Sequence, residues 1–375
     1  MSETELQNLA NLIKQWTKEL GFQAVGIVKP DLRCHKDKIE QWLAKGYHGT
    51  MSFLERNVDM RLNPDLLHPN TVRIISVRMN YLPENARFAT NLQAPEQGYI
   101  SRYAVGRDYH KLMRKRLKQL ADLIKNHCQK TDARPFVDSA PVLERFLAQD
   151  AGLGWQGKNS LIISPEAGSW FFLGELFINL PLPETTRKQE NLCGNCVACL
   201  KICPTNAIVA PYTIDSRRCI SYLTIEHDGV IDPQLRPLIG NKIYGCDDCQ
   251  LICPWNKYGQ ISQETDFQFR DCWQSLDLVE LLAWNEQEFL SKTQGSAIRR
   301  IGYEKWQRNL AIALGNAPNS KQILPALQNA LGKVSPMVDE HIRWAIERQQ
   351  AVEYAQDKRS QRLINSIKKG LIRDA

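Results

Sequence analysis

The chain has 375 residues, of which 43% are hydrophobic and 24% are charged, and its formal net charge is +7. These values are ordinary for a globular protein with two or three domains and a substantial core. No apolar stretch approaches the roughly 20 residues of a membrane span, and the N-terminus lacks the basic and apolar regions of a secretory signal, so we expect a cytoplasmic protein.

The first block of the chain, residues 1–185, mixes helices and strands. Ser2-x-x-Glu5 can form a capping box, and apolar residues at helical spacing follow it up to Leu20, so a helix opens the chain. Strands are predicted over 22–28, 72–77, 136–137, 160–164 and 170–179, and further helices over 39–45, 112–124 and 142–149. Because the elements do not alternate as βαβ units, the pattern favours the α+β class.

A glycine-rich run follows the predicted helix at 142–149. Gly152, Gly154 and Gly157 match G-x-G-x-x-G literally, but the dinucleotide fingerprint needs a strand before it and a helix after it. Here the order is reversed, so no Rossmann site is expected. The glycines allow close backbone approach to a ligand, with Lys158 and Asn159 as donors, or they form an ordinary tight turn.

Asp138 comes directly after a predicted strand and has apolar neighbours. In such surroundings the pKa of a carboxyl group is raised, and the acid can donate a proton at neutral pH. The alternative is structural, since Asp138 or Ser139 is also well placed to cap the following helix. Upstream, Arg102-Tyr103 and the basic aromatic run 107–110 either grip a phosphate or a large cofactor, or form a surface network.

The segment 186–270, which begins after Pro181-Leu182-Pro183, is dominated by cysteines. Cys193, Cys196, Cys199 and Cys203, followed by a proline, have the C-x2-C-x2-C-x3-C-P spacing of bacterial ferredoxins. Cys246, Cys249 and Cys253 repeat the last three positions of this motif. Ile243 occupies the first position, and Cys219 lies between the two runs and can supply the missing thiolate.

In ferredoxin motifs the fourth cysteine binds the other cluster, which predicts how the eight thiolates divide. The first 4Fe–4S cluster takes Cys193, Cys196, Cys199 and Cys253, and the second takes Cys203, Cys219, Cys246 and Cys249. Zinc and disulfides are the alternatives. Structural zinc sites usually pair C-x2-C units across a longer loop, and disulfides do not suit a chain without a secretory signal. Cys34, Cys128 and Cys272 stand alone, and we interpret them as ordinary cysteines.

From about residue 276 the pattern is wholly helical. Two helical stretches, near 308–316 and 338–346, repeat loosely and suggest a short HEAT-like array over 276–375. This part of the chain is also basic, which indicates either a polyanionic partner such as nucleic acid or a solvated helix face.

Several ordered stretches resemble one known family. They are Arg134-Pro-Phe-Val-Asp-Ser-Ala-Pro-Val-Leu-Glu-Arg145, Gly152-Leu-Gly-Trp-Gln-Gly-Lys-Asn-Ser160, the Cys193 run, Cys219-Ile-Ser-Tyr-Leu-Thr-Ile-Glu226, and Gly240-Asn-Lys-Ile-Tyr-Gly-Cys-Asp-Asp-Cys-Gln250. Together they resemble the epoxyqueuosine reductases. The resemblance runs from the N-terminus through the helical tail.

The resemblance implies a cobalamin-dependent enzyme with two 4Fe–4S clusters that reduces the epoxide of epoxyqueuosine in tRNA to queuosine. Asp138 matches the proton donor of the family. The implied cofactor contacts are Asn57, Arg102, Tyr103, Asp138, Gly154, Gly157, Lys158, Asn159, Ser221, Asp247 and Asp248. No histidine is expected to bind the cobalt, because Met113 replaces the glycine of the Asp-x-His-x-x-Gly motif after Asp108-x-His110.

The resemblance also implies partners. The helical tail would bind the anticodon arm of tRNA, and a reduced flavodoxin or ferredoxin would supply electrons to a monomeric enzyme that does not touch a membrane. Two other functions fit part of the pattern: a reductive dehalogenase with the same cofactors, and a non-catalytic two-cluster electron carrier. The first does not explain a basic helical tail, and the second leaves residues 1–185 without a function.

Overall fold

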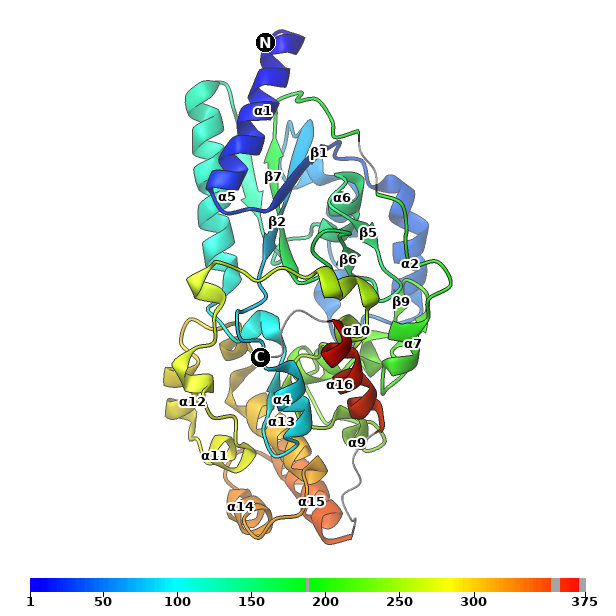
Figure 1. The fold of residues 1–375 in the computed structure, drawn as a ribbon, viewed down its shortest axis with the longest axis vertical. Helices are drawn as coiled ribbons and strands as arrows, with labels where there is room; N and C mark the ends of the chain where they lie inside the picture. Colours follow the sequence, from blue (N-terminus) through cyan, green and yellow to red (C-terminus); the bar gives the residue numbers. More distant parts are fainter. Residues whose placement is uncertain (187–188, 352–357, 371–375) are drawn as a thin grey trace.

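A four-stranded antiparallel sheet of order β1-β2-β7-β4 forms the centre of the first block in the computed structural model, which describes residues 1–186, 189–351 and 358–370 (Figure 1). Its strands are β1 (Ala24–Val28), β2 (Arg73–Asn80), β7 (Phe171–Ile178) and β4 (Ala133–Phe136). Each strand overlaps a predicted one, and the α+β class is confirmed.

Helices cover both faces of this sheet. α1 (Glu3–Glu19) and α5 (Tyr109–His127) pack on one face, and α6 (Glu144–Asp150) packs on the other (Figure 1). Successive side chains of a strand point to opposite faces, so Ile75 and Val77 of β2 join the core with α1 and α5, whereas Ile74 joins the core with α6. Both faces of β2 and β7 are therefore buried, and the sheet is a rigid base for the loops at its ends.

The other elements of the first block are short. They are α2 (Lys36–Ala44), α3 (Val58–Leu62), α4 (Phe88–Gln93), β3 (Tyr99–Ile100), β5 (Trp155–Gln156) and β6 (Ile162–Ile163). The strand predicted over 160–164 is reduced to β6, which pairs with β5 in a small hairpin and not with the main sheet. Gly157 donates its N–H to Leu161 O (2.7 Å), and Ser160 has a φ of 65°, so a tight turn takes the place of the expected strand start.

The cysteine-rich segment consists of loops and short elements. These are α7 (Ala198–Ile202), β8 (Ile208–Ala210), β9 (Thr213–Ile214), α8 (Ile220–Ile225), α9 (Arg236–Ile239), β10 (Lys242–Tyr244) and α10 (Asp248–Leu251). β10 pairs in parallel with β3 of the first block. This pairing joins the second cysteine run to the segment that carries Arg102 and Tyr103.

Helices follow to the end of the described chain. They are α11 (Leu278–Leu282), α12 (Glu286–Lys292), α13 (Gly302–Asn316), α14 (Ile323–Ala330), α15 (Pro336–Ala351) and α16 (Lys358–Gly370). α13 packs along α15, and at Gly315 a Cβ atom would lie 3.0 Å from Ala345 Cα, so only glycine allows this approach. The pair is the part of the tail closest to a helical repeat; the HEAT-like array remains a prediction.

α16 returns to the first block. Its apolar residues Leu363, Ile364 and Ile367 enter the same core as Leu92 of α4, and the two helices lie side by side (Figure 1). A second core combines Ile100, Tyr244 and the helices α11, α13 and α15. The three predicted domains (1–185, 186–270 and 276–375) therefore share cores, and their boundaries stay predictions.

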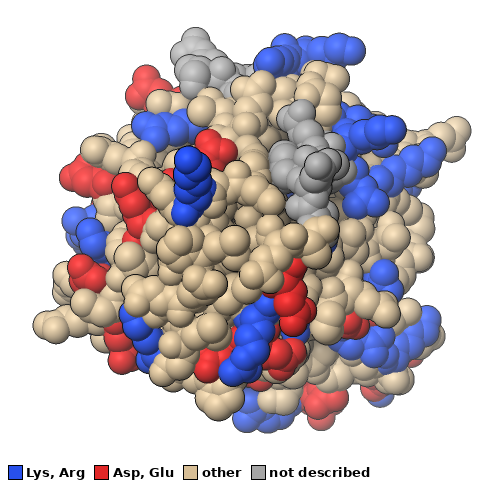
Figure 2. All heavy atoms as spheres, turned by 90° about the horizontal axis from the view of Figure 1, so that it is seen from below, with Lys and Arg blue, Asp and Glu red and all other residues tan. Residues whose placement is uncertain are grey.

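The surface of the helical end carries both signs of charge. In the view from below, Lys and Arg side chains are interspersed with Asp and Glu side chains over most of the face (Figure 2). This face is thus not uniformly basic. Within the described ranges, none of the helices has both the length and the apolar character that crossing a bilayer requires.

Candidate active site

A cavity of about 880 Å³ lies where the three parts of the chain meet. Trp42 of α2, the Asp138 turn, Ser221 and Tyr222 of α8, and Arg300 are among its lining residues. The volume is at the upper end of the roughly 300–1,000 Å³ that small-molecule sites usually have. Such a cavity admits a large cofactor or a nucleoside.

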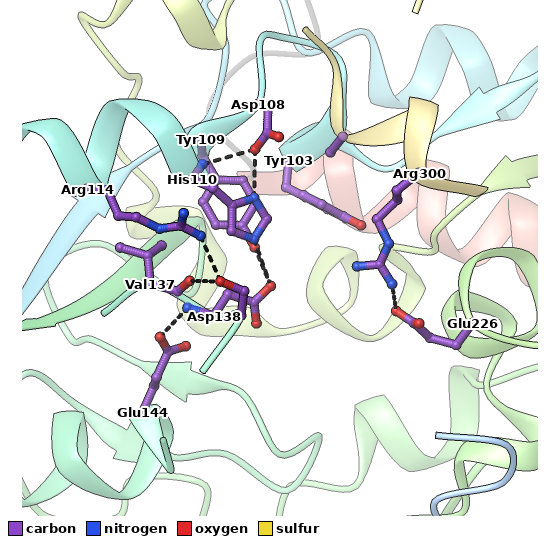
Figure 3. A network of polar contacts seen from close by, with 12 residues as sticks. Tyr103, Asp108, Tyr109, His110, Arg114, Val137, Asp138, Glu144, Glu226 and Arg300 are labelled. Atoms are coloured by element: carbon purple, nitrogen blue, oxygen red, sulfur yellow. Dashed lines mark hydrogen bonds and ion pairs between the residues drawn. The ribbon is translucent and has the colours of Figure 1, made fainter. Parts of the chain in front are cut away.

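One wall of the cavity is a network of polar contacts around Asp138 (Figure 3). Tyr109 donates its hydroxyl proton to Asp138 Oδ2 (2.8 Å), and His110 Nε2 lies 3.2 Å from the same oxygen. The other ring nitrogen, His110 Nδ1, lies 2.6 Å from Asp108 Oδ1. The imidazole therefore bridges two carboxylates, of which Asp138 faces the cavity with 51% of its side chain exposed.

The proton of this network is held by His110. Burial alone would lower the pKa of His110, but the hydrogen bonds to Asp108 and Asp138 and their charges outweigh it and raise the pKa to about 9. Burial would raise the pKa of Asp138, but the hydrogen bonds from His110 and Tyr109 prevail and lower it. The expected rise in the pKa of Asp138 is therefore wrong: the acid of the pair is the His110 imidazolium, and the Asp138 carboxylate accepts its hydrogen bond.

The backbone places Asp138 on a turn and not at a helix cap. α6 begins at Glu144, and Leu143 in its N-cap position makes no side-chain capping bond, so neither Asp138 nor Ser139 caps the helix as proposed. Instead, Ser139 donates its N–H to Val137 O (2.6 Å), and Asp138 between them has a φ of 54°. Aspartate tolerates this left-handed conformation better than most residues do.

Two further carboxyl groups lie behind the turn. Glu144 Oε1 accepts the backbone N–H of Asp138 (2.6 Å), and Glu175, on β7, is completely buried beside Glu144. Burial and the charge of Asp138 raise the pKa of Glu144 to about 7. Burial and the neighbouring Glu144 raise the pKa of Glu175 well above its ordinary value. At neutral pH this pair therefore keeps a proton.

Neighbouring charges indicate which motif cysteines lie close together, and their division into two ligand sets stays a prediction. Burial, together with the charges of nearby Cys193, Cys199 and Cys196, raises the pKa of Cys253 to about 12. Burial also raises the pKa of Cys249, and the charges of nearby Cys219, Cys203 and Cys199 raise it as well. Thiols that repel each other in this way are stable as thiolates only with bound cations, and a coordinating metal removes their protons outright.

The donor set fits iron–sulfur clusters better than zinc. Within the described ranges, no group of three or more His, Cys, Asp and Glu side chains is arranged to hold a single metal ion. A cubane cluster instead takes one thiolate at each of four irons, so its ligands surround a larger volume. Cys219 also lines the cavity, so a cluster bound there would adjoin the space that Asp138 faces.

The structure separates the predicted cofactor contacts into two sets. Tyr103, Asp138 and Ser221 line the cavity. The others are not among its lining residues: Asn57, Arg102, Gly154, Gly157, Lys158, Asn159, Asp247 and Asp248. For all of them a cofactor contact remains a prediction, but the contacts of the second set indicate structural roles.

Arg102 and Asp247 join the cysteine segment to the first block. The Arg102 guanidinium is buried and donates to Ile100 O (2.5 Å) and Asn91 Oδ1 (2.7 Å), among other oxygens. The buried Asp247 carboxylate accepts from Tyr99, Ser101 and the backbone N–H of Arg102. A cofactor contact through either side chain would have to replace these bonds, so such a contact is not supported here.

The residues of the glycine run contact the protein itself. At Gly154 an added Cβ would lie 2.4 Å from Ile163 O, and at Gly157 it would lie 2.4 Å from the Ile163 side chain, so both glycines allow the β5–β6 hairpin to close. Lys158 Nζ donates to Gly194 O (2.5 Å) and Cys196 O (2.9 Å) in the first cysteine loop. These contacts favour the tight-turn alternative.

The remaining three residues of the second set are also engaged elsewhere. Asn159 Nδ2 donates to Cys249 O (3.3 Å), which ties the turn to the second cysteine run. Asp248 forms a buried ion pair with Lys242 (3.1 Å). Asn57 is exposed, has a φ of 62° and precedes α3.

Sequence reasoning missed several residues of the network. Glu144 and Glu175 gave no signal as acids, because both lie in segments assigned to ordinary helix and strand. Tyr109 and His110 were noticed only as part of a basic aromatic run, and their contact with Asp138 spans 29 and 28 residues. A charged residue in the middle of the otherwise apolar strand at 170–179 was the one cue available for Glu175.

Comparisons with known proteins agree with this site. Residues 61–139 match the family model described as "Epoxyqueuosine reductase QueG, DUF1730", and residues 192–256 match a 4Fe–4S double cluster binding domain. The epoxyqueuosine reductase of Escherichia coli is 57% identical over 381 residues, which cover 100% of both chains. The chain belongs to the epoxyqueuosine reductase family.

Solved structures of this family have the same fold. An epoxyqueuosine reductase crystallised with an epoxyqueuosine-modified tyrosine tRNA stem loop is 28% identical, with a TM-score of 0.81 and coverage of 96% of this chain and 97% of that one. The enzyme from Bacillus subtilis, in a structure whose catalytic aspartate loop is swung out of the active site, is also 28% identical with a TM-score of 0.81, and covers 96% of this chain and 98% of its own. The family is one of oxidoreductases, and membership of it favours the epoxyqueuosine reductase over the dehalogenase and electron-carrier alternatives.

Proposed function

We propose that this chain reduces the epoxide of epoxyqueuosine in tRNA to the alkene of queuosine, with cobalamin bound in the 880 Å³ cavity. The observation that carries the proposal is that one cavity is lined both by Cys219, a predicted cluster ligand, and by Asp138 with its proton-holding network. Relatives named for this reaction, one of them solved with a modified tRNA stem loop, support the choice of substrate.

The reaction requires electrons and protons in equal number. Converting an epoxide to an alkene takes two electrons and two protons, breaks both carbon–oxygen bonds and releases the oxygen as water. When bound, the two clusters would supply electrons one at a time, and Cys219, a predicted ligand of the second cluster, lines the cavity. Asp138 passes one of the two protons from His110 to the departing oxygen, Asp108 orients the imidazole through Nδ1, and solvent supplies the second proton.

The walls of the cavity suit a corrin. Apolar side chains such as Ile39, Trp42 and Leu54 can pack against the ring, and Ser221 and Thr213 offer hydroxyl groups for its peripheral amides. His110 is the lining histidine in the described part of the chain, and both of its nitrogens are engaged, so no imidazole is free to bind the cobalt. When bound, cobalamin would supply a metal centre that collects single electrons and delivers a pair.

Several basic side chains line the cavity. Lys45, Lys111, Arg299 and Arg300 are among the lining residues, and they can contact phosphates next to an inserted wobble nucleoside. The basic residues of α16 would extend this contact to the rest of the anticodon arm. A reduced flavodoxin or ferredoxin would load the clusters, and we expect a monomeric enzyme that works in the cytoplasm, where its tRNA substrate is found.

The test is direct conversion of the nucleoside. The chain is reconstituted anaerobically with iron, sulfide and cobalamin, and then reduced in the presence of tRNA from cells that lack the activity. We expect epoxyqueuosine to disappear and queuosine to appear in nucleoside analysis. Unchanged epoxyqueuosine with fully loaded clusters and bound cobalamin would overturn the proposal.

A further inference from the structure

The Asp138 turn needs support, because its conformation is unusual. Asp138 has a φ of 54°, and the bond from Ser139 N–H to Val137 O closes a three-residue turn around it. A turn of this kind with a positive φ at its centre is the rarer and more strained γ-turn. Strained backbone of this kind persists only where surrounding contacts hold it.

One side-chain contact holds the backbone of Asp138 itself. Glu144 Oε1 accepts the Asp138 N–H at 2.6 Å, across six positions of the chain. A charge-assisted bond to a backbone N–H is among the stronger hydrogen bonds in proteins. Glu144 is also the first residue of α6, which packs on β1, β2 and β7, so its own backbone is anchored in the core.

Glu175 in turn contacts Glu144 and supports its position. Its Oε1 accepts a hydrogen bond from Ser76 Oγ (3.3 Å), whereas Glu175 Oε2 has no hydrogen-bond partner when the group is ionised. A protonated Oε2 resolves this, because it can donate to the adjacent Glu144 carboxylate. The chain of contacts then runs from Ser76 through Glu175 and Glu144 to the backbone of Asp138.

We propose that Glu144, supported by Glu175, is a positioning residue that holds the Asp138 turn and thereby keeps the Asp138 carboxylate against His110 and Tyr109 in the cavity wall. The inference rests on the proposed function for its catalytic consequence, but not for the contact itself. Glu144 is not among the residues that line the cavity, so it acts on the reaction through Asp138.

The charges around Glu144 make its hydrogen bond to the Asp138 N–H depend on pH. Because the pKa of Glu144 is raised to about 7, a fraction of the molecules carries a neutral and weaker acceptor at acidic pH. The ionisable groups that face it come from four elements and are Asp138, Glu175, His110, Tyr109 and Arg145. The bond to the Asp138 N–H therefore strengthens as pH rises through about 7.

The experiment compares two variants of the cluster-loaded chain. Glu144→Ala removes the acceptor, whereas Glu144→Gln keeps an oxygen acceptor at the same place and removes the titration. Glu286→Ala is the control, since Glu286 is likewise the first residue of its helix and is exposed. Hydrogen–deuterium exchange of the amides of 137–143, single-turnover rate and KM for tRNA are measured for each variant between pH 6 and 8.

We expect Glu144→Ala to speed exchange at the Asp138 amide about tenfold. The same variant should lower the single-turnover rate about 10- to 100-fold, with KM for tRNA changed less than about twofold. Glu144→Gln should restore slow exchange and most of the rate, and lose the pH dependence near 7. Unchanged exchange in Glu144→Ala, or failure of Glu144→Gln to restore it, overturns the inference.

The exchange measurement needs no substrate, so it separates the two proposals. If the wild-type chain does not convert epoxyqueuosine but Glu144→Ala still loosens the Asp138 amide, the proposed function fails and the positioning role stands. If conversion proceeds normally and both variants match the wild type, the proposed function stands and the positioning role fails. A Glu286→Ala variant that behaves like Glu144→Ala would show a general helix effect and also overturns the inference.

Discussion

The two walls of the cavity differ in how their parts are held in place. On the electron side, thiols from two short runs and Cys219 converge, and the spacing along the chain largely determines their positions. On the proton side, the network combines His110 of α5, Glu144 of α6, Glu175 of β7 and the Asp138 turn. These residues come together only in the folded chain. Loss of one cysteine ligand should therefore abolish binding of a whole cluster, whereas loss of one contact in the Asp138 network should only reduce the rate of proton transfer.

The sharpest way to break this comparison is to remove Cys219. Cys219→Ala should lose the second cluster, so that iron falls from about eight to about four per chain and turnover disappears. Iron analysis and the nucleoside assay measure both. Cys272→Ala is the control, because Cys272 is not one of the eight predicted cluster ligands and its removal should leave the full iron content. Full iron content in Cys219→Ala would contradict the assignment of the eighth ligand.

The next effect tests the proton side directly. Asp138→Asn removes the group that passes the proton to oxygen, so the single-turnover rate should fall about 100- to 10,000-fold while iron and cobalamin contents stay the same. Asp122→Asn, on an exposed position of α5, is the matched control. A variant Asp138→Asn with the wild-type rate would remove Asp138 from the mechanism.

A smaller effect, with a distinct pH dependence, is expected at His110. Its imidazolium is present below a pKa of about 9 and is lost above it, so the wild-type rate should decline as pH rises through 9. His110→Gln should be about 10- to 100-fold slower and should lack this decline. Single-turnover rates of both proteins between pH 6 and 10 test this prediction. If the rate of His110→Gln still declines above pH 9, the decline comes from the titration of another group.

The same pKa predicts a change in stability. Because the folded-state pKa of His110 exceeds its ordinary value of 6.5, the stabilisation by the network is complete below pH 6.5 and is lost as pH rises through about 9. The free energy of unfolding should therefore fall by up to about 3 kcal/mol over this window, and by less in His110→Gln. Urea unfolding of both proteins at pH 6 and 9.5 measures the difference.

The smallest expected effect concerns the basic residues of α16, which we propose to contact tRNA and which do not line the cavity. Neutralising Lys368 and Lys369 on α16 should weaken tRNA binding and reduce the slope of log K against log salt by about 1 to 2. Lys14 and Lys18 on α1 provide the control pair. If the slope is unchanged, the phosphate contacts lie elsewhere, with the lining residues Arg299 and Arg300 as the next candidates.

The sequence predicted those features that depend on short-range patterns. The four strands of the main sheet and the helical tail follow from local spacing, and the resemblance pointed to Asp138, which lines the cavity. The sequence did not predict the turn at Asp138, because a helix cap and a left-handed turn share the same residue preferences.

Burial and long-range contacts explain the remaining differences. The pKa of Asp138 was expected to be raised by its apolar neighbours. Instead, hydrogen bonds from His110 and Tyr109 of α5 lower it. Likewise, Arg102 and Asp247 have the composition of a ligand site, yet their bonds join two segments of the protein. Only the folded chain shows which partner each charge has.

The account depends most on a corrin lying between Cys219 and Asp138, and binding of cobalamin measures this most directly. The cluster-loaded chain is mixed with cobalamin under anaerobic conditions, passed through gel filtration, and its absorption spectrum is recorded during stepwise reduction. We predict one corrinoid per chain, with cobalt reduction that depends on the clusters and is absent in Cys219→Ala. Elution of the loaded chain without corrinoid would contradict the account.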